Sequence, residues 1–217
     1  MSYKIDLHTH SIASPDGALT AGDYQHALEK ELLDFIAVTD HNTIAFARQL
    51  QAELGDRIII GEEIKTTEGE IIGLYLKESI PSQLSPKETI VRIRNQGGLV
   101  YIPHPFETVR SGISMKTLET IAGDVDIIEV HNGRAVLQNR SEIAKEWAVQ
   151  NHIPGAASSD AHGVAGWGRT YSVLPAKPTR GRLAQQLHQA TYEAHWPGFK
   201  GLLYPKVNRF KKKIGNA

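Results

Sequence analysis

The stretch Asp6-Leu7-His8-Thr9-His10 closes the first predicted strand of the sequence. Because side chains alternate between the two faces of a strand, Asp6, His8 and His10 are expected to point the same way. Two imidazoles about 6–7 Å apart along a strand can share a metal ion or a metal cluster. We expect the Asp6 carboxylate to orient one ring through its second nitrogen. A single His-x-His pattern does not define a metal site, so the question is whether these residue types recur at other strand ends.

Apolar runs of strand length alternate with helical patterns along the chain. Phe35–Val38 and Leu99–Ile102 are continuous apolar runs, as expected of strands buried on both faces. A helix is predicted over 135–150, a late strand over 167–174 and a last helix over 180–191. Repeated strand–helix units predict a parallel sheet with helices outside, and six or seven units in about 200 residues favour a closed or nearly closed barrel. In such barrels the active site follows the carboxyl ends of the strands.

The composition restricts the possible metal ligands but does not indicate a binding partner. Twenty-four basic residues balance twenty-four acidic ones, so net charge indicates no particular ligand. The sequence contains no cysteine, which excludes disulfides and thiolate sites and leaves His, Asp and Glu as strong metal ligands. No apolar run approaches the ~18 residues of a membrane span, and no signal-peptide pattern is present. We therefore expect a cytoplasmic protein.

Histidines and carboxylates recur directly after the predicted strands. They are His8, His10, Asp40, His41, Glu62, Glu63, His104, Glu129, His131, Asp160 and His162, with Asp16 from the loop after the first strand. Imidazoles and carboxylates without cysteine suit Mn, Fe or Zn, and Mg is also compatible. More than five ligands imply more than one ion, and multinuclear sites of this kind typically catalyse hydrolysis with a metal-activated water.

Five motifs in register resemble a known family. They are His8-Thr-His10, Thr39-Asp40-His41, Gly61-x-Glu63, Pro103-His104-Pro105 and Ser159-Asp160-Ala-His162. In order and context they are similar to the PHP (polymerase and histidinol phosphatase) family of metal-dependent phosphoesterases, over about residues 3–175. The resemblance implies an α/β fold, a distorted seven-stranded (β/α) barrel of the PHP type. It implies a single PHP domain over 1–217 and a centre of two or three divalent ions.

The same resemblance implies a set of metal ligands. They are His8, His10, His41, Glu63, His104, Asp160 and His162. Glu63 is the expected bridging carboxylate, because the family pattern is Gly-x-Glu. Asp16 lies where many members place a further ligand in the loop after His-x-His. Where many members carry a His before a hairpin strand, this chain has Glu70, so either Glu70 ligates or a third metal is absent. His131 is expected to be a ligand, a substrate-facing residue or a residue that supports a ligand from behind.

Several polar residues outside the ligand set are candidates for substrate binding and catalysis. Arg110 and Arg134 each follow a strand-end motif, where a guanidinium group could bind phosphate or lie solvated in a loop. Arg169 is a third candidate, and Asp40 and His131 complete the catalytic set. From about residue 196 the sequence is basic, with no acidic residue after Glu193. This extension could contact a polyanionic substrate, but solvation or packing on a neighbouring subunit is the preferred interpretation.

The leading hypothesis is a phosphoesterase that hydrolyses small phosphate esters, either a phosphomonoester or a short nucleotide phosphodiester. We expect a small phosphorylated substrate, including a nucleotide or short oligonucleotide, with no membrane partner and no obligate protein partner. One alternative is an amidohydrolase-type C–N hydrolase. Those barrels usually use a strand-end Lys, and Lys65 is the only Lys close to a motif. The other alternative is a non-catalytic PHP module, which would be expected to have lost ligands.

Overall fold

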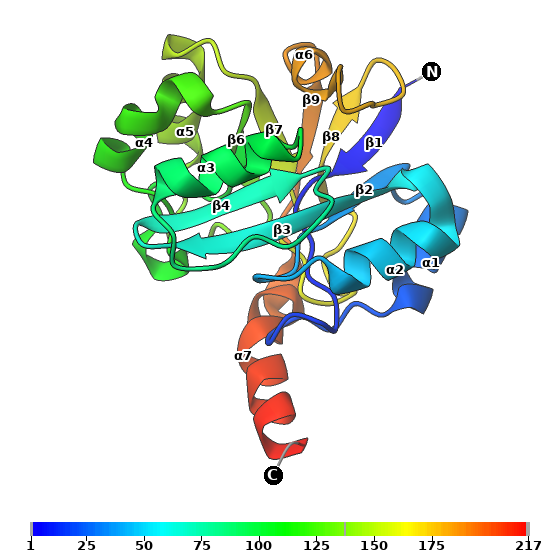
Figure 1. Cartoon of the computed structure of the whole chain (residues 1–217). Helices are drawn as coiled ribbons and strands as arrows, with labels where there is room; N and C mark the ends of the chain where they lie inside the picture. Colours follow the sequence, from blue (N-terminus) through cyan, green and yellow to red (C-terminus); the bar gives the residue numbers. More distant parts are fainter. Residues whose placement is uncertain (1, 137, 216–217) are drawn as a thin grey trace.

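The computed structural model describes residues 2–136 and 138–215, and within them nine strands form one mixed sheet. The strands are β1 (Tyr3–Asp6), β2 (Phe35–Val38), β3 (Ile58–Thr66), β4 (Gly69–Leu74), β5 (Leu99–Ile102), β6 (Ile127–Asn132), β7 (Gly155–Ser158), β8 (Thr170–Leu174) and β9 (Thr191–Ala194). The helices are α1 (Ala21–Glu29), α2 (Ala45–Leu54), α3 (Pro86–Asn95), α4 (Met115–Ile121), α5 (Ser141–Gln150), α6 (Leu183–Leu187) and α7 (Gly198–Gly215). Helices α1 to α5 lie outside the curled sheet (Figure 1).

The sheet runs in the order β7-β6-β5-β4-β3-β2-β1-β8-β9 and nearly closes on itself. Strands β1 to β3 and β5 to β7 form two parallel sets, and β4 lies antiparallel between them. Across the remaining opening, the Ala157 N–H of β7 donates to the Ser172 hydroxyl of β8 at 2.8 Å. The Tyr192 hydroxyl of β9 donates to the Gly155 carbonyl at 3.2 Å. The predicted barrel is confirmed.

The predicted count of seven strands is wrong. Strand β8, which matches the late strand predicted over 167–174, pairs antiparallel with β1, and the unpredicted strand β9 pairs antiparallel with β8. The helix predicted over 180–191 ends at Leu187, and the residues from Thr191 form β9. Residues from Thr191 are a strand because they pair with β8. Such a tertiary contact cannot be predicted from the helical periodicity of the sequence. The helix predicted over 135–150 begins at Ser141; residue 137 of that prediction lies outside the described residues.

Local signals explain why several elements begin where they do. The Thr20 hydroxyl accepts from the Asp23 N–H and the Asp23 carboxylate accepts from the Thr20 N–H, a capping box that starts α1. Ser85 caps α3, with Pro86 at the first helical position. Every residue of β2 is buried, which is why its sequence is apolar without alternation.

The barrel interior is apolar at one end and polar at the other. Ile5, Ile59, Ile72 and Tyr101 are buried in one cluster together with residues of α6, which covers one end of the barrel. Helix α7 lies at the opposite end (Figure 1). The segment predicted only as a basic extension thus forms an 18-residue helix. Among the described helices, none is long and apolar enough to cross a membrane.

Candidate metal centre

The two histidines of the opening motif meet as the strand period predicts. The Nε2 atoms of His8 and His10 lie 3.0 Å apart, and both side chains are buried. Two later strand-end residues reach the same place through a left-handed backbone, with φ of 28° at His104 and 51° at Asp160. Backbone of this kind is unfavourable for residues other than glycine and concentrates at functional sites.

Glu63 lies between two sets of imidazoles. Its Oε1 atom is 3.0 Å from His104 Nε2 and 3.4 Å from His8 Nε2. Its Oε2 atom is 3.1 Å from His41 Nδ1 and 3.3 Å from His10 Nε2. Each carboxylate oxygen therefore faces a different pair of rings, an arrangement in which one carboxylate can contact two cations.

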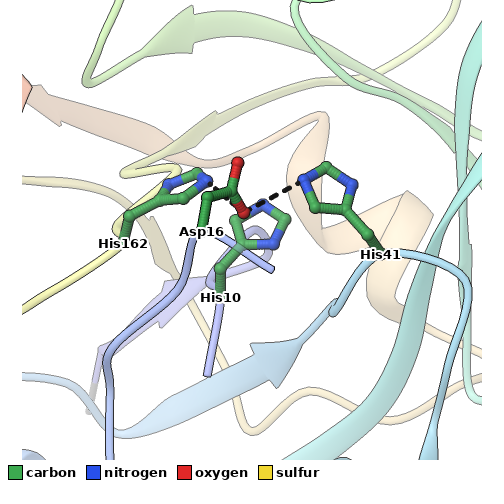
Figure 2. A group of neighbouring side chains, drawn as sticks. All are labelled: His10, Asp16, His41 and His162. Atoms are coloured by element: carbon green, nitrogen blue, oxygen red, sulfur yellow. Dashed lines mark ion pairs between the residues drawn. The ribbon is translucent and has the colours of Figure 1, made fainter. Parts of the chain in front are cut away.

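A second group consists of His10, Asp16, His41 and His162, whose donor atoms lie within 4.8 Å of one another (Figure 2). Asp16 Oδ1 is 3.4 Å from Nε2 of both His41 and His162. It is buried and has no hydrogen-bond partner among the described residues. A carboxylate oxygen left unpaired between imidazole nitrogens fits a bound cation, since burial without a partner is costly.

The structure brings all nine predicted ligands into such groups. The remaining groups are His8, His10 and Glu63; His8, His104 and Asp160; and His41, Glu63 and Glu70. Glu70 is the most distant member, with its Oε2 atom 3.9 Å from His104 Nε2. Burial raises the pKa of Glu70 to about 8, and the neighbouring Glu63 carboxylate adds to the shift. The donor set and its geometry fit divalent metal ions, and we conclude that this cluster is suited to binding them.

The electrostatics differ among the central donors: burial would lower the pKa of His8 and His41, but neighbouring carboxylates raise both, that of His41 to about 9, so a bound cation would displace a proton from these two rings. His10 and Glu63 are in forms that bind cations without losing a proton. Burial lowers the pKa of His10 to about 3, and His162 adds to this shift, so His10 is neutral. Burial alone would raise the pKa of Glu63, but His8 and His41 hold it well below its usual range. Neutral imidazoles and ionised carboxylates are the protonation states required of metal ligands.

Glu129, rather than Asp6, orients the His8 ring. Glu129 Oε1 lies 3.2 Å from His8 Nδ1 and accepts from the Tyr101 hydroxyl at 2.8 Å. Asp6 instead accepts hydrogen bonds from the backbone N–H of His8 and from the N–H and hydroxyl of Ser159. The prediction for Asp6 is wrong because its carboxylate oxygens are engaged by the His8 backbone, by Ser159 and by the Trp167 indole instead of a ring nitrogen of His8. The only feature of the sequence that pointed to Glu129 as the partner of the His8 ring was its position at the end of a strand.

Asp40 does not line the site. It accepts from the N–H and hydroxyl of Ser11 and from the Ser14 hydroxyl, which lies 3.1 Å from His10 Nδ1. Asp40 thus holds the loop after β1 in place and supports His10 through Ser14. It is a positioning residue, not a residue that contacts substrate.

His131 is not brought into the cluster. The pairing of β6 with β7 shifts between Glu129 and His131, a β-bulge that breaks the alternation of side chains. The His131 ring instead packs against Tyr192, with ring centroids 5.7 Å apart. Asn132 takes the inward position and donates to Glu129 Oε2 at 2.8 Å. The prediction that His131 is a ligand or faces substrate is therefore not supported.

The three candidate arginines differ in their surroundings. Arg110 donates to both oxygens of Glu107, to Asn132 and to Asp160 Oδ2 at 2.7 Å, so each of its three nitrogens is engaged. Arg134 contacts Asp160 Oδ2 at 3.2 Å, and its buried Nε has no hydrogen-bond partner among the described residues. Arg169 is exposed and donates to the Trp196 carbonyl, away from the cluster.

The cluster faces a cavity of about 340 Å³ that helix α7 helps to enclose. Lys206 and Arg209 of α7 line it together with Arg134 and Lys65. Arg209 donates to Asp16 Oδ2 at 2.6 Å. Individual roles for Lys206 and Arg209 were missed because the sequence shows only that the segment is basic, not where it folds back.

The barrel thus carries a buried cluster of histidines and carboxylates at one end, with cationic side chains at the rim of the cavity. No protein-family model matches the chain. Among curated proteins, it is 39% identical over 142 residues to the uncharacterized protein MJ1587 of Methanocaldococcus jannaschii, covering 59% of this chain and 81% of the relative. It is 36% identical to MJ0417 of the same organism, covering 77% of this chain and 69% of the relative. A 5'-3' exoribonuclease of Haemophilus influenzae is 36% identical over 37% of this chain and 32% of that protein.

Solved structures share the fold. A two-domain protein of Bacteroides vulgatus, described as containing a predicted PHP-like metal-dependent phosphoesterase, matches 98% of this chain and 70% of its own with a TM-score of 0.72 and 21% identity. A lesion-specific endonuclease of Pyrococcus furiosus matches 88% of this chain and 58% of its own with a TM-score of 0.64 and 16% identity. The chain belongs to one family with its two Methanocaldococcus relatives, and its fold is that of the PHP-like phosphoesterase structure.

Proposed function

We propose that this protein is a metal-dependent phosphoesterase that hydrolyses small phosphate esters. The observation that carries the proposal is one cavity with two kinds of wall. One wall is the cluster of nine imidazole and carboxylate donors, and the other is a rim of cations contributed by Lys65, Arg134, Lys206 and Arg209. A metal centre surrounded by fixed positive charge suits an anionic substrate.

The donor groups indicate which residues would hold the ions. His8, His104 and Asp160 form one set and His10, Asp16, His41 and His162 another, with Glu63 contacting both. The ions supply an activated water and neutralise charge on the phosphoryl oxygens. The protein's own contribution is to fix these donors through Glu129 and Ser14 and to keep cationic side chains at the rim.

Arg134 is the proposed phosphate-binding residue. Its side chain lies at the cavity, 17% exposed, and its Nε donor is unpaired among the described residues. Because Nε is buried, the terminal guanidinium nitrogens are the donors that can form a charge-assisted hydrogen bond to a phosphoryl oxygen. Arg110, held by Glu107 and Asn132, is better described as a brace for Asp160.

The C–N hydrolase alternative is less well supported. The carboxylate that contacts both donor sets is Glu63, whereas Lys65 is exposed at the cavity rim. The non-catalytic alternative requires lost ligands, and all nine predicted donors are present and converge. We therefore retain hydrolysis of phosphate esters as the single proposed activity.

Within this activity we propose a nucleotide or short oligonucleotide as the substrate class. A cavity of about 340 Å³ is at the small end of ligand sites, which suits one phosphate group and an attached small moiety. One relative is a 5'-3' exoribonuclease and one structural neighbour is a lesion-specific endonuclease. These likenesses support phosphate esters of nucleic-acid type, and they leave the choice between monoester and diester to experiment.

The test is a substrate screen on protein purified without chelators. Hydrolysis of p-nitrophenyl phosphate, bis(p-nitrophenyl) phosphate and a dinucleotide is measured with added Mn²⁺, Fe²⁺, Zn²⁺ or Mg²⁺, and again after chelation. We expect phosphate-ester hydrolysis that chelation abolishes and added metal restores. Hydrolysis of the amide p-nitroacetanilide, with no action on any phosphate ester, would contradict the proposal.

A further inference from the structure

Helix α7 has two faces of opposite character. Its inner face rests on the barrel: the Asn208 amide donates to the carbonyls of Asp16 and His162, and Lys212 donates to the carbonyl of Ile12. The fit is close, because a Cβ atom added to Gly163 would lie 2.6 Å from the ring of Tyr204. This face accounts for how α7 is held in the structure.

The outer face carries a stripe of exposed apolar side chains. Its members are Phe199, Leu203, Val207, Phe210 and Ile214, with exposed fractions from 42% to 75%. At 3.6 residues per turn these five positions fall within an arc of about 80°. Asn208 and Lys212 lie on the opposite side of the helix. The stripe therefore points away from the barrel, and α7 projects from the body of the molecule (Figure 1).

Lysines flank the stripe on both sides. Lys200 and Lys211 follow one edge, Lys206 and Lys213 follow the other, and all four are exposed. Helix α7 contains no acidic residue. Trp196, 51% exposed, packs edge-on against Phe199 at the start of the helix, with ring centroids 4.9 Å apart. Such a pattern, apolar and aromatic in the centre with lysines at the margins, is typical of helices that lie in a membrane surface.

We infer that the outer face of α7 binds the surface of an anionic lipid bilayer. The apolar stripe would enter the boundary between headgroups and acyl chains, and the flanking lysines would contact lipid phosphates. Charge complementarity selects this occupant over a second copy of the chain, because pairing two α7 stripes would bring lysine margins against lysine margins. The earlier expectation of no membrane partner rested on the lack of a spanning segment, which surface binding does not need.

The inference is independent of the proposed activity and is tested by vesicle flotation. Full-length protein is mixed with vesicles of phosphatidylcholine alone or of phosphatidylcholine and phosphatidylglycerol in equal parts. We expect flotation only with the anionic vesicles, and a decrease as salt is raised. Replacing three lysines (Lys200→Gln, Lys211→Gln, Lys213→Gln) should weaken binding roughly a hundredfold, since each basic residue near an anionic surface contributes about fivefold.

The stripe is tested with the double variant Leu203→Gln, Phe210→Gln. It should lose vesicle binding by more than about tenfold, while circular dichroism and the thermal midpoint stay as in the wild type. Val149→Gln, which changes a 74% exposed apolar residue on α5, is the matched control and should bind vesicles normally. Absence of flotation with anionic vesicles overturns the inference, as does flotation that the stripe variant leaves unchanged. A concentration-dependent dimer that the stripe variant abolishes, without vesicle binding, would assign the stripe to a second copy instead.

Discussion

Arg110 and Asp160 form an ion pair inside the candidate metal centre, with Arg110 Nη1 2.7 Å from Asp160 Oδ2. The same guanidinium is held from the other side by Glu107, a carboxylate that is 3% exposed. Burial would lower the pKa of Arg110, but Asp160 and Glu107 raise it above its ordinary value. The pair therefore fixes the position of Asp160, a proposed metal ligand. Arg110 thus serves as a brace, whereas Arg134 is the proposed phosphate-binding residue.

Arg110→Ala is expected to destabilise the protein and reduce its metal content. The substitution leaves the buried carboxylate of Glu107 without its cation and leaves Asp160 with Arg134 alone, and breaking a buried pair costs about 3–5 kcal/mol. Denaturant unfolding and metal analysis check this outcome. Wild-type stability and full metal content in the variant would show that Arg110 is not a brace.

Arg134→Ala is expected to retain its metals and lose activity. If its guanidinium group binds a phosphoryl oxygen, kcat/KM for a phosphate ester should fall by about 2–4 kcal/mol in transition-state free energy. Arg169→Ala, in which an exposed arginine outside the cavity is removed, is the control and should behave as the wild type. Unchanged kinetics in Arg134→Ala would exclude it as the phosphate-binding residue.

The wild-type protein is expected to hold at least two divalent ions per chain. Nine donors in four overlapping groups exceed what one ion coordinates, and Glu63 contacts both halves of the cluster. Elemental analysis of protein purified without chelators and loaded with Mn²⁺ or Zn²⁺ measures the ratio. A saturated ratio of one ion per chain would contradict the two-centre arrangement.

Glu63→Gln is expected to lose both metals and turnover. An ionised carboxylate between two cations offsets their mutual repulsion, and an amide cannot do so. Glu62→Gln is a matched control on the neighbouring residue of β3, where the side chain accepts from the Ile80 N–H instead of facing the cluster. Glu62→Gln should keep its metals; equal metal loss in both variants would deny Glu63 a specific role.

Glu62 also predicts a pH dependence of stability in the metal-free protein. Burial raises its pKa from an ordinary value of 4.5 to about 7. Between these values the unfolded chain binds fewer protons than the native chain. The free energy of unfolding should therefore decrease as pH rises from about 4.5 to about 7, by up to about 3 kcal/mol from this group. Denaturant unfolding of chelator-treated wild type and Glu62→Gln at pH 5 and pH 8 measures the difference. A variant that loses as much stability as the wild type over this interval would contradict it.

Much of the site was predictable because it depends on local geometry. The i, i+2 spacing of His8 and His10 on a strand sets their convergence, and the carboxyl ends of parallel strands meet at one end of a barrel. Residue types at those ends therefore pointed to seven of the nine donors that the structure brings together; Asp16 came from the loop after the first strand and Glu70 from the family resemblance. The apolar runs of β2 and β5 were located correctly for the same reason, since burial on both faces leaves a continuous apolar segment.

Tertiary contacts decided what local spacing does not determine. A β-bulge in β6 turned His131 away and directed Asn132 inward. The reach of Glu129 across the barrel, rather than the proximity of Asp6 in sequence, selected the partner of the His8 ring. Antiparallel pairing with β8 formed β9 (Thr191–Ala194), a strand that the sequence did not predict; the helix predicted over 180–191 overlaps it only at Thr191.

The arginines and α7 also show which features follow from the sequence alone and which depend on tertiary contacts. The sequence determined by itself that a basic segment follows Glu193 and that arginines follow two of the strand-end motifs. Only the folded chain placed Arg209 against Asp16 and engaged Arg110 with Asp160. Local periodicity specifies which face of an element a residue occupies, whereas hydrogen-bond partners far apart in sequence are selected by packing of the whole barrel.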